Sequence, residues 1–212
     1  MVSTLPVLPN NTFEWSHTLE ENWGTILEEL EVVLKDRERI PNFQDILENQ
    51  KTITNDDNWK TYFLYGFGIK NKKNCTKCPE TTKLLENITG MKSAFFSILS
   101  PGKKIPPHRG FYKGFVRYHL GLIIPQESKK CYIQIANQKA YWEPGKSLIF
   151  DDTYTHHVQN NTEEERVILF LDIMRPLRFP YMFINYIAMN LLRRIPVIKK
   201  SKTNLIRWND GV

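Results

Sequence analysis

The chain has 212 residues, of which 41% are hydrophobic and 25% are charged, and this composition excludes an intrinsically disordered protein. Its length fits one domain with additional terminal segments, since a domain commonly takes roughly 100 to 200 residues. The net charge of +6 is moderate, and three cysteines are too few for a disulfide framework, so we expect a protein of the reducing cytoplasm.

The N-terminal part of the sequence predicts helices and loops. Apolar residues recur at helical spacing over 16–37, with Ser16 as the expected cap, and a shorter helix is expected over 79–88. We assign residues 1–90 to a helical and loop segment that packs on the core. Its polar, proline-broken beginning does not resemble a secretory leader.

The sequence also contains a CxxC pair, Cys75 and Cys78. Only Cys131 remains as a further thiol, which excludes a four-cysteine zinc site and favours a structural role for the pair.

From residue 91 the pattern changes to short strands rich in aromatic and β-branched residues, separated by turn sequences such as PGKK and EPGK. Strands this short at such regular intervals predict a barrel or a double-sheet jelly roll over residues 91–176. The expected strands are 94–100, 115–124, 130–136, 139–142, 147–150 and 166–174.

The C-terminal segment, residues 177–212, combines an apolar helix with a basic tail. Residues 179–192 fall short of the roughly 20 apolar residues that span a membrane, so we expect a helix that packs on the domain or lies in a membrane interface. Basic runs at 70–77 and 193–202 fit either a solvated surface or a phosphate-bearing partner. Without a nucleic-acid-binding motif, nucleic acid is disfavoured, and we expect peripheral membrane contact through 179–202.

Polar residues in the β region indicate a buried site. Arg117 and His119 are two apart on one predicted strand, so they share a face, and the apolar residues that alternate with them share the other. A buried arginine and histidine need a charged or hydrogen-bonded partner, so we expect something anionic inside. Arg166, at the start of the last strand, offers forked donors that suit a carboxylate.

Two histidines, one at each end of this predicted core, complete the pattern. His108 and His156 suit an iron centre that also binds a small dicarboxylate, because imidazole nitrogens are good Fe(II) ligands. A non-haem iron site often has a carboxylate two residues after its first histidine, and here that position is Gly110. Taken alone, the spacing of these two histidines favours satisfied surface or core residues over metal ligands. His157, next to His156 in an extended segment, should point away from the cavity.

Three stretches resemble the aspartyl/asparaginyl β-hydroxylase family of Fe(II)- and 2-oxoglutarate-dependent dioxygenases, and their residues are most similar to those of its lipid A 2-hydroxylase branch. They are NCTKCPETTKLLENITGMKSAFFSILSPG, HRGFYKGFVRYHLGL and WEPGKSLIFDDTYTHHVQNNTEEERVILFLDIMRP, and the resemblance runs from about Trp59 to Pro176. It implies a cupin-like double-stranded β-helix that uses Fe(II), 2-oxoglutarate and O₂ to hydroxylate an unactivated C–H bond.

The resemblance also implies the metal ligands. His108 and His156 would bind the iron without a third side chain, as in peptide-hydroxylating members, which also have glycine at the position of Gly110. Members of the lipid A branch carry aspartate there. Iron halogenases share the glycine and bind chloride in its place, so halogenation stays an alternative outcome.

The remaining site residues follow from the same resemblance. Arg166 would bind the distal carboxylate of 2-oxoglutarate with help from Ser97. Arg117 and His119 would face the end of the cosubstrate that chelates iron. Residues expected to contact the substrate are Trp59 and Phe115.

The sequence leaves the substrate open between an acyl lipid, an Asp or Asn side chain of a peptide, and a small molecule. Peptide hydroxylases have a further arginine where this chain has Phe115, and an apolar ring beside the iron favours an apolar substrate. A third interpretation is a jelly-roll binding protein without turnover. Retention of both histidines and both arginines argues against it.

Overall fold

The computed structural model describes residues 5–192 and 194–210. Its strands are β1 (Val7–Leu8), β2 (Trp59–Gly66), β3 (Ile69–Lys70), β4 (Met91–Leu99), β5 (Lys104–His108), β6 (Phe115–Ile123), β7 (Cys131–Ile135), β8 (Gln138–Tyr141), β9 (Ser147–Phe150), β10 (His156–Asn160) and β11 (Arg166–Met174). Its α-helices are α1 (Trp15–Glu21), α2 (Trp23–Leu34), α3 (Phe43–Ile46), α4 (Lys72–Lys77), α5 (Pro79–Glu86), α6 (Tyr181–Leu192) and α7 (Pro196–Asp210).

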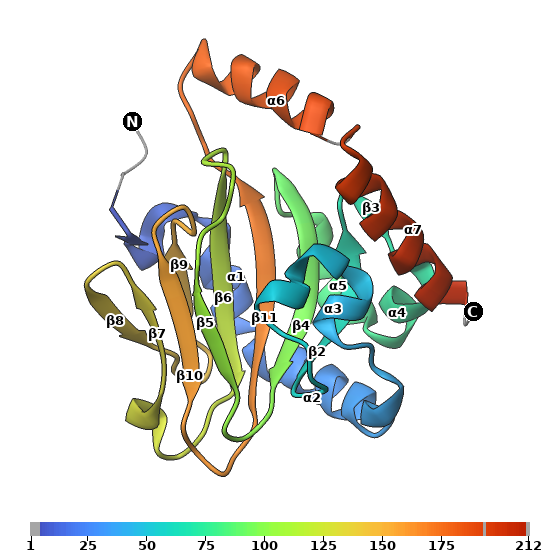
Figure 1. The fold of residues 1–212 in the computed structure, drawn as a ribbon, viewed down its shortest axis with the longest axis vertical. Helices are drawn as coiled ribbons and strands as arrows, with labels where there is room; N and C mark the ends of the chain where they lie inside the picture. The colour runs from blue at the N-terminus through green and yellow to red at the C-terminus, as the bar shows by residue number, and fades with distance from the viewer. Residues whose placement is uncertain (1–4, 193, 211–212) are drawn as a thin grey trace.

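Within the described residues the strands form two antiparallel sheets (Figure 1). The larger has seven strands in the order β1-β9-β6-β11-β4-β2-β3, and the smaller has four in the order β5-β10-β7-β8. The mainly β, double-sheet jelly roll predicted from the strand spacing is therefore confirmed. Each strand predicted from the sequence is present within a few residues of its expected bounds.

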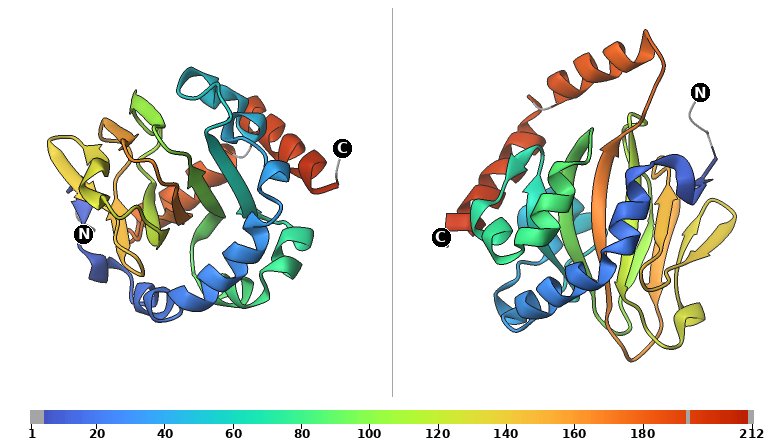
Figure 2. Two further views of the ribbon diagram at one scale, coloured as in Figure 1. Left: turned by 90° about the horizontal axis from the view of Figure 1, so that it is seen from below. Right: turned by 180° about the vertical axis from the view of Figure 1, so that it is seen from behind.

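The two faces of the large sheet have different neighbours. On one face Val116, Tyr118 and Leu120 of β6 join a buried apolar cluster with residues of α2 and α5, such as Leu30 and Leu85. Figure 2 shows the blue N-terminal helices on this side and the red α7 on the other. The alternation predicted along β6 is confirmed, because Arg117 and His119 line a cavity on the opposite face.

Several sequence predictions about the N-terminal segment were wrong in detail. The helix expected over 16–37 is two helices, α1 and α2, and Ser16 lies inside α1, where its hydroxyl donates to the Phe13 carbonyl at 2.6 Å. Residues 59–66 form strand β2 of the large sheet, so the segment 1–90 contributes a strand to the core as well as helices. The helix expected over 79–88 is confirmed as α5.

Two strands and one helix were also missed further along the chain. β5 and β10 lie outside the strands predicted from the sequence, and they pair with each other. The basic tail is mostly helical, since α7 begins at Pro196, while Arg193 lies outside the described residues.

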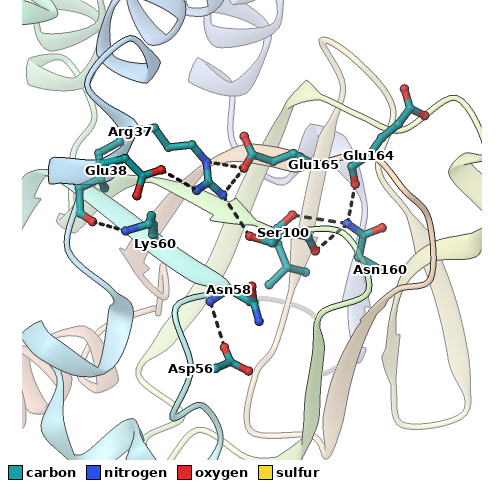
Figure 3. Close-up of polar contacts among 11 residues, drawn as sticks. Arg37, Glu38, Asp56, Asn58, Lys60, Ser100, Asn160, Glu164 and Glu165 are labelled. Atoms are coloured by element: carbon teal, nitrogen blue, oxygen red, sulfur yellow. Dashed lines mark hydrogen bonds and ion pairs between the residues drawn. The ribbon is translucent and has the colours of Figure 1, made fainter.

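A polar network at one end of the sheets joins the helical layer to both of them (Figure 3). Arg37 donates from Nε and Nη2 to Glu165 at 2.9 and 2.6 Å, and from Nη2 to the Ser100 hydroxyl at 3.0 Å. The Asn160 amide, at the end of β10, donates to the Ser100 carbonyl at 3.1 Å and the Glu164 carbonyl at 2.8 Å. These contacts connect the two sheets, because Asn160 ends β10 of the small sheet and Ser100 follows β4 of the large one.

The C-terminal helices lie on the cavity side. α7 packs against β2, where Leu205 joins Phe63 and Phe95. α6 extends past the ends of the strands (Figure 1). No helix in the described part of the chain is both long enough and apolar enough to cross a bilayer.

Candidate functional site

A cavity of about 490 Å³ opens between the large sheet, the small sheet and the C-terminal helices. This volume is within the range of roughly 300 to 1,000 Å³ that is usual for ligand sites. Most of the lining residues are apolar, although polar residues such as Lys92 and Arg109 also contribute. The polar side chains that build the candidate site are His108, Arg117, His119, Asp152, His156 and Arg166.

The two predicted metal ligands face each other. His108, at the end of β5, pairs directly with His156, at the start of β10, and their ring centroids are 4.1 Å apart. The expectation that they occupy opposite ends of the core was therefore wrong, because the antiparallel pairing of β5 with β10 brings them together. His108 and His156 are far apart in the sequence, so their contact could not be predicted without knowing how these strands pair.

Both imidazoles are oriented in the same way. The Nδ1 atom of His108 lies 2.9 Å from the Pro106 carbonyl, and that of His156 lies 2.9 Å from the Tyr154 carbonyl. A carbonyl only accepts, so each Nδ1 carries the proton and each Nε2 keeps its lone pair for a ligand. Backbone acceptors of this kind commonly fix histidine ligands of metals.

Burial keeps these rings neutral. It lowers the pKa of His108, and burial together with the neighbouring His108 lowers the pKa of His156 to about 4. Neutral imidazole is the form that binds a metal ion.

Asp152 explains the glycine at position 110. A Cβ atom at Gly110 would lie 2.1 Å from the Asp152 Oδ2 atom, and the Gly110 amide donates to the Asp152 carbonyl at 2.8 Å. The carboxylate of Asp152 therefore occupies the space that a side chain at position 110 would need. Its Oδ1 atom is buried and has no hydrogen-bond partner among the described residues.

Arg117 holds this carboxylate in place. Its Nε and Nη2 atoms donate to Asp152 Oδ2 at 3.0 and 2.7 Å, and its Nη1 atom pairs with Asp172. The anionic partner that the sequence required for Arg117 is thus supplied by the chain itself. The expected role of Arg117 beside the iron-chelating end of the cosubstrate stays a prediction.

His119 offers an unused donor to the cavity. The Trp142 indole N–H donates to His119 Nδ1 at 3.2 Å, which makes Nδ1 an acceptor. Burial, with Arg166 and Arg117 nearby, lowers the pKa of His119 well below its usual value, so the ring is neutral and its proton is on Nε2. That Nε2 is buried and lacks a partner among the described residues.

Arg166 is a buried cation with no carboxylate partner in the described part of the chain. Its guanidinium lies 4.7 Å from the centroid of the Trp142 ring, and among the described residues its one hydrogen bond is a long one of 3.4 Å to the Ser97 carbonyl. Burial lowers its pKa to about 10, so it remains charged at neutral pH. A buried unpaired charge is costly, which indicates an anionic ligand.

The other predicted residues are distributed along the cavity. The Trp59 indole donates to the Ser97 hydroxyl at 3.0 Å, so both lie near Arg166. Phe115 lines the cavity and makes an edge-on contact with Tyr112. His157 packs on Tyr132 and is absent from the lining, as predicted.

Sequence reasoning missed three residues of the site: Asp152, Asp172 and Trp142. Asp152 was within reach of inference, because the carboxylate missing at position 110 has a substitute four residues before His156. Asp172 and Trp142 gave no signal, since each sits in an otherwise ordinary strand or turn sequence.

The residues present fit a divalent iron ion and a dicarboxylate. His108 and His156 provide two nitrogen ligands, and the free Oδ1 of Asp152 is an acceptor beside them. Deeper in the cavity, His119 and Arg166 present donors that need an anion. A dicarboxylate that chelates iron at one end and reaches Arg166 at the other satisfies both sets.

The chain is similar in sequence to known hydroxylases. Residues 20–176 match the family model described as aspartyl/asparaginyl beta-hydroxylase. An ornithine lipid ester-linked acyl 2-hydroxylase from Rhizobium tropici is 44% identical over 203 residues, which cover 96% of this chain and 72% of that protein. The aspartyl/asparaginyl beta-hydroxylase of Mus musculus is 34% identical over 164 residues, covering 75% of this chain but only 21% of that protein.

A solved structure with a similar strand arrangement is a prolyl-4-hydroxylase from Pseudomonas putida. It is 15% identical, with a TM-score of 0.47, and the match covers 76% of this chain and 100% of that one.

Proposed function

The chain belongs to the aspartyl/asparaginyl β-hydroxylase family, and we propose that this hydroxylase depends on Fe(II) and 2-oxoglutarate and acts on the acyl chain of a lipid. The observation that carries the proposal is the cavity itself. Its lining includes two neutral histidines and two donors without a partner among the described residues, and most of its other lining residues are apolar.

In this proposal His108 and His156 hold the iron through Nε2, and Arg166 and Ser97 receive the distal carboxylate of 2-oxoglutarate. Bound iron, 2-oxoglutarate and O₂ supply the oxidation, in which one oxygen atom enters the substrate C–H bond and the other enters succinate as CO₂ leaves. The protein positions the reactants and excludes water. No side chain is required as a general base.

Asp152 favours hydroxylation over halogenation. Its carboxylate already occupies the space beside Gly110, where a halogenase binds chloride. A chloride ion there would meet a negative charge at close range. The free Oδ1 instead suits a hydrogen bond from a water molecule.

The apolar outer cavity supports an acyl substrate. Phe63, Phe95 and Phe170 line it from the large sheet, and Leu47 and Met189 line it from other elements. An acidic peptide side chain would find few cations there, whereas a hydrocarbon chain gains roughly 0.8 kcal/mol for each buried methylene. The Rhizobium relative, whose name states an ester-linked acyl substrate, matches over more of this chain than the mouse peptide hydroxylase does.

The test is turnover with matched substrates. Fe(II)-loaded protein with 2-oxoglutarate and O₂ is given a detergent-dispersed ornithine lipid, a lipid A-type lipid, or Asp- and Asn-containing peptides, and succinate and one added oxygen atom are measured. Hydroxylation of either lipid supports the proposal and identifies the lipid class. Hydroxylation of peptides alone would replace the lipid with a protein substrate, and 2-oxoglutarate binding without turnover on any of them would favour the binding-protein interpretation.

The proposed function also implies where in the cell the protein acts. A protein that acts on membrane lipid would be cytoplasmic and peripheral to the bilayer, in contact through residues 179–202. Basic residues and an apolar helix in that range support such contact.

A further inference from the structure

Helix α6 has its polar and apolar sides reversed. A surface helix usually buries its apolar stripe and exposes its polar face. In α6 the buried residues are Asn185 and Met189, and no residue of the twelve is charged. Its large exposed side chains are all apolar or aromatic: Tyr181, Met182, Phe183, Ile184, Tyr186, Ile187 and Leu191.

Specific contacts hold the helix in this orientation. The Tyr112 hydroxyl donates to Asn185 Oδ1 at 2.5 Å, and Asn185 Nδ2 donates to the Gly114 carbonyl at 3.1 Å. The approach is so close that a Cβ atom at Gly114 would lie 2.2 Å from Asn185 Oδ1. Since the polar residue faces the protein, the apolar side has to face outward.

The charged residues that flank α6 in the sequence are all basic, although Arg175 pairs with Asp151 and Lys200 pairs with Glu48. Residues 173–209 contain eight Lys and Arg and no Asp or Glu, whereas the rest of the chain has 21 basic and 23 acidic residues. Arg178 precedes the helix, and Arg194 and Lys199 follow it, all exposed. A second copy of the chain packed on this face by a two-fold axis would bring these like charges together, which disfavours a dimer.

The apolar outer face therefore requires a cover that is both apolar and negatively charged at its rim. We propose that α6 docks the protein on an anionic phospholipid surface, with its outward face among the acyl chains and the flanking arginines and lysines at the head groups. An exposed apolar face of this kind marks an interaction site, and each basic residue near such a surface adds about tenfold or less to binding.

Docking in this orientation has a consequence for the substrate, which rests on the proposed function. Met189 and Leu192, on the protein side of α6, line the cavity together with Ile195, Val197 and Ile198. A chain leaving the lipid layer beneath α6 would thus stay in apolar surroundings on its way to His108 and His156. Loop 109–114, which carries Gly110, is bound to the same helix through Asn185.

The test measures docking without catalysis. Full-length protein free of iron and 2-oxoglutarate is sedimented with vesicles of phosphatidylcholine, or of phosphatidylcholine mixed with phosphatidylglycerol. The test variant is Phe183→Gln with Ile187→Gln, which changes side chains that are 58% and 44% exposed. The matched control is Val32→Gln with Tyr141→Gln, at 54% and 41% exposure on α2 and β8.

We expect wild type and control to bind the anionic vesicles, and the α6 variant to bind roughly tenfold or more weakly, since two large side chains no longer enter the lipid. Binding to phosphatidylcholine alone should be weaker for all three. Circular dichroism checks that the variants fold. Equal binding by the three proteins, or no binding by wild type, would overturn the proposal.

Light scattering tests the alternative that a second copy of the chain packs on the outer face of α6. A wild-type dimer that the α6 substitutions dissociate, without vesicle binding, would assign the face to a second copy and overturn lipid docking. Failure of turnover on detergent-dispersed lipid would instead count against the proposed function and leave the docking result intact, because the sedimentation uses no cosubstrate.

Discussion

The two faces of the large sheet are made by the same strands and are satisfied in opposite ways. Along β11, Val167, Leu169 and Leu171 enter a close-packed apolar cluster beneath the N-terminal helices. The alternate positions include Arg166, which faces the cavity with a buried donor lacking a partner in the described chain. The helix-covered face is fully packed with apolar side chains of the protein itself. The cavity face has buried donors that find a hydrogen-bond partner only when a ligand is bound. Substitutions on the two faces should therefore be separable into effects on stability and effects on function.

The largest functional effect is expected at the metal ligands. His108→Ala or His156→Ala should weaken Fe(II) binding by more than about a hundredfold, since loss of groups that merely orient a ligand already costs 10- to 100-fold. The measurement is an anaerobic titration that follows the visible band of iron-bound 2-oxoglutarate. The control is His157→Ala, which should keep the band, because His157 follows His156 in the sequence but packs on Tyr132 outside the cavity. A normal band in both alanine variants would reject this site.

Two substitutions on β11 test whether the cavity face serves ligand binding and the helix-covered face serves stability. Arg166→Met should weaken 2-oxoglutarate binding by roughly two orders of magnitude, as expected when a buried charged pair loses one partner, and should leave Fe(II) binding nearly unchanged. It should leave the stability of the ligand-free protein unchanged or raise it, because it removes a buried charge without a carboxylate partner in the described chain. Leu169→Ala should instead lower the free energy of unfolding by about 2 to 5 kcal/mol. Calorimetry and urea unfolding measure the two quantities. Strong destabilisation by Arg166→Met would show that the cavity face is also structural.

A double-mutant cycle examines the contact between Gly110 and Asp152. Gly110→Ala should destabilise the protein by about 1 to 3 kcal/mol, because the added methyl group collides with the carboxylate. In an Asp152→Ala background the same change should cost much less. Urea unfolding of the four proteins gives the coupling free energy. Additive effects would mean that Asp152 does not fill the space at position 110.

The sequence predicted local features of this site and missed those that depend on pairing between distant strands. The alternation along β6 places Arg117 and His119 together because residues two apart share a face. The contact between His108 and His156 depends on the pairing of β5 with β10, and the proline-containing β5 reads as a loop.

The same limit explains the error at residues 59–66. Segment β2 is buried on both faces, so its sequence WKTYFLYG shows no clean alternation, and its partner β4 lies some 30 residues further along the chain. The reversed helix α6 was recognisable only as an apolar run. Its outward orientation depends on Asn185 reaching Tyr112 and Gly114, which are distant in sequence.

The smallest expected effect is a pH dependence to which the buried histidines of the cavity face contribute. Burial lowers the pKa of His119 well below 6.5 and that of His156 to about 4, so in this range the unfolded chain binds more protons than the folded one. Stability is therefore complete above about pH 6.5 and falls as the pH drops toward 4. Between pH 6.5 and about 5, each such histidine contributes a loss of at most about 2 kcal/mol.

Urea unfolding of the ligand-free protein at several pH values measures this slope. His119→Gln should flatten it, because the variant has one fewer buried group to protonate on unfolding. His17→Gln, at an exposed position of α1, is the control and should keep the wild-type slope. If removing His119 leaves the slope unchanged, the ring takes up a proton in the folded protein over the same pH range as in the unfolded chain. It would then present charged donors to the cavity and could not accept the Trp142 hydrogen bond, so the assignment of a single free donor at Nε2 would be lost.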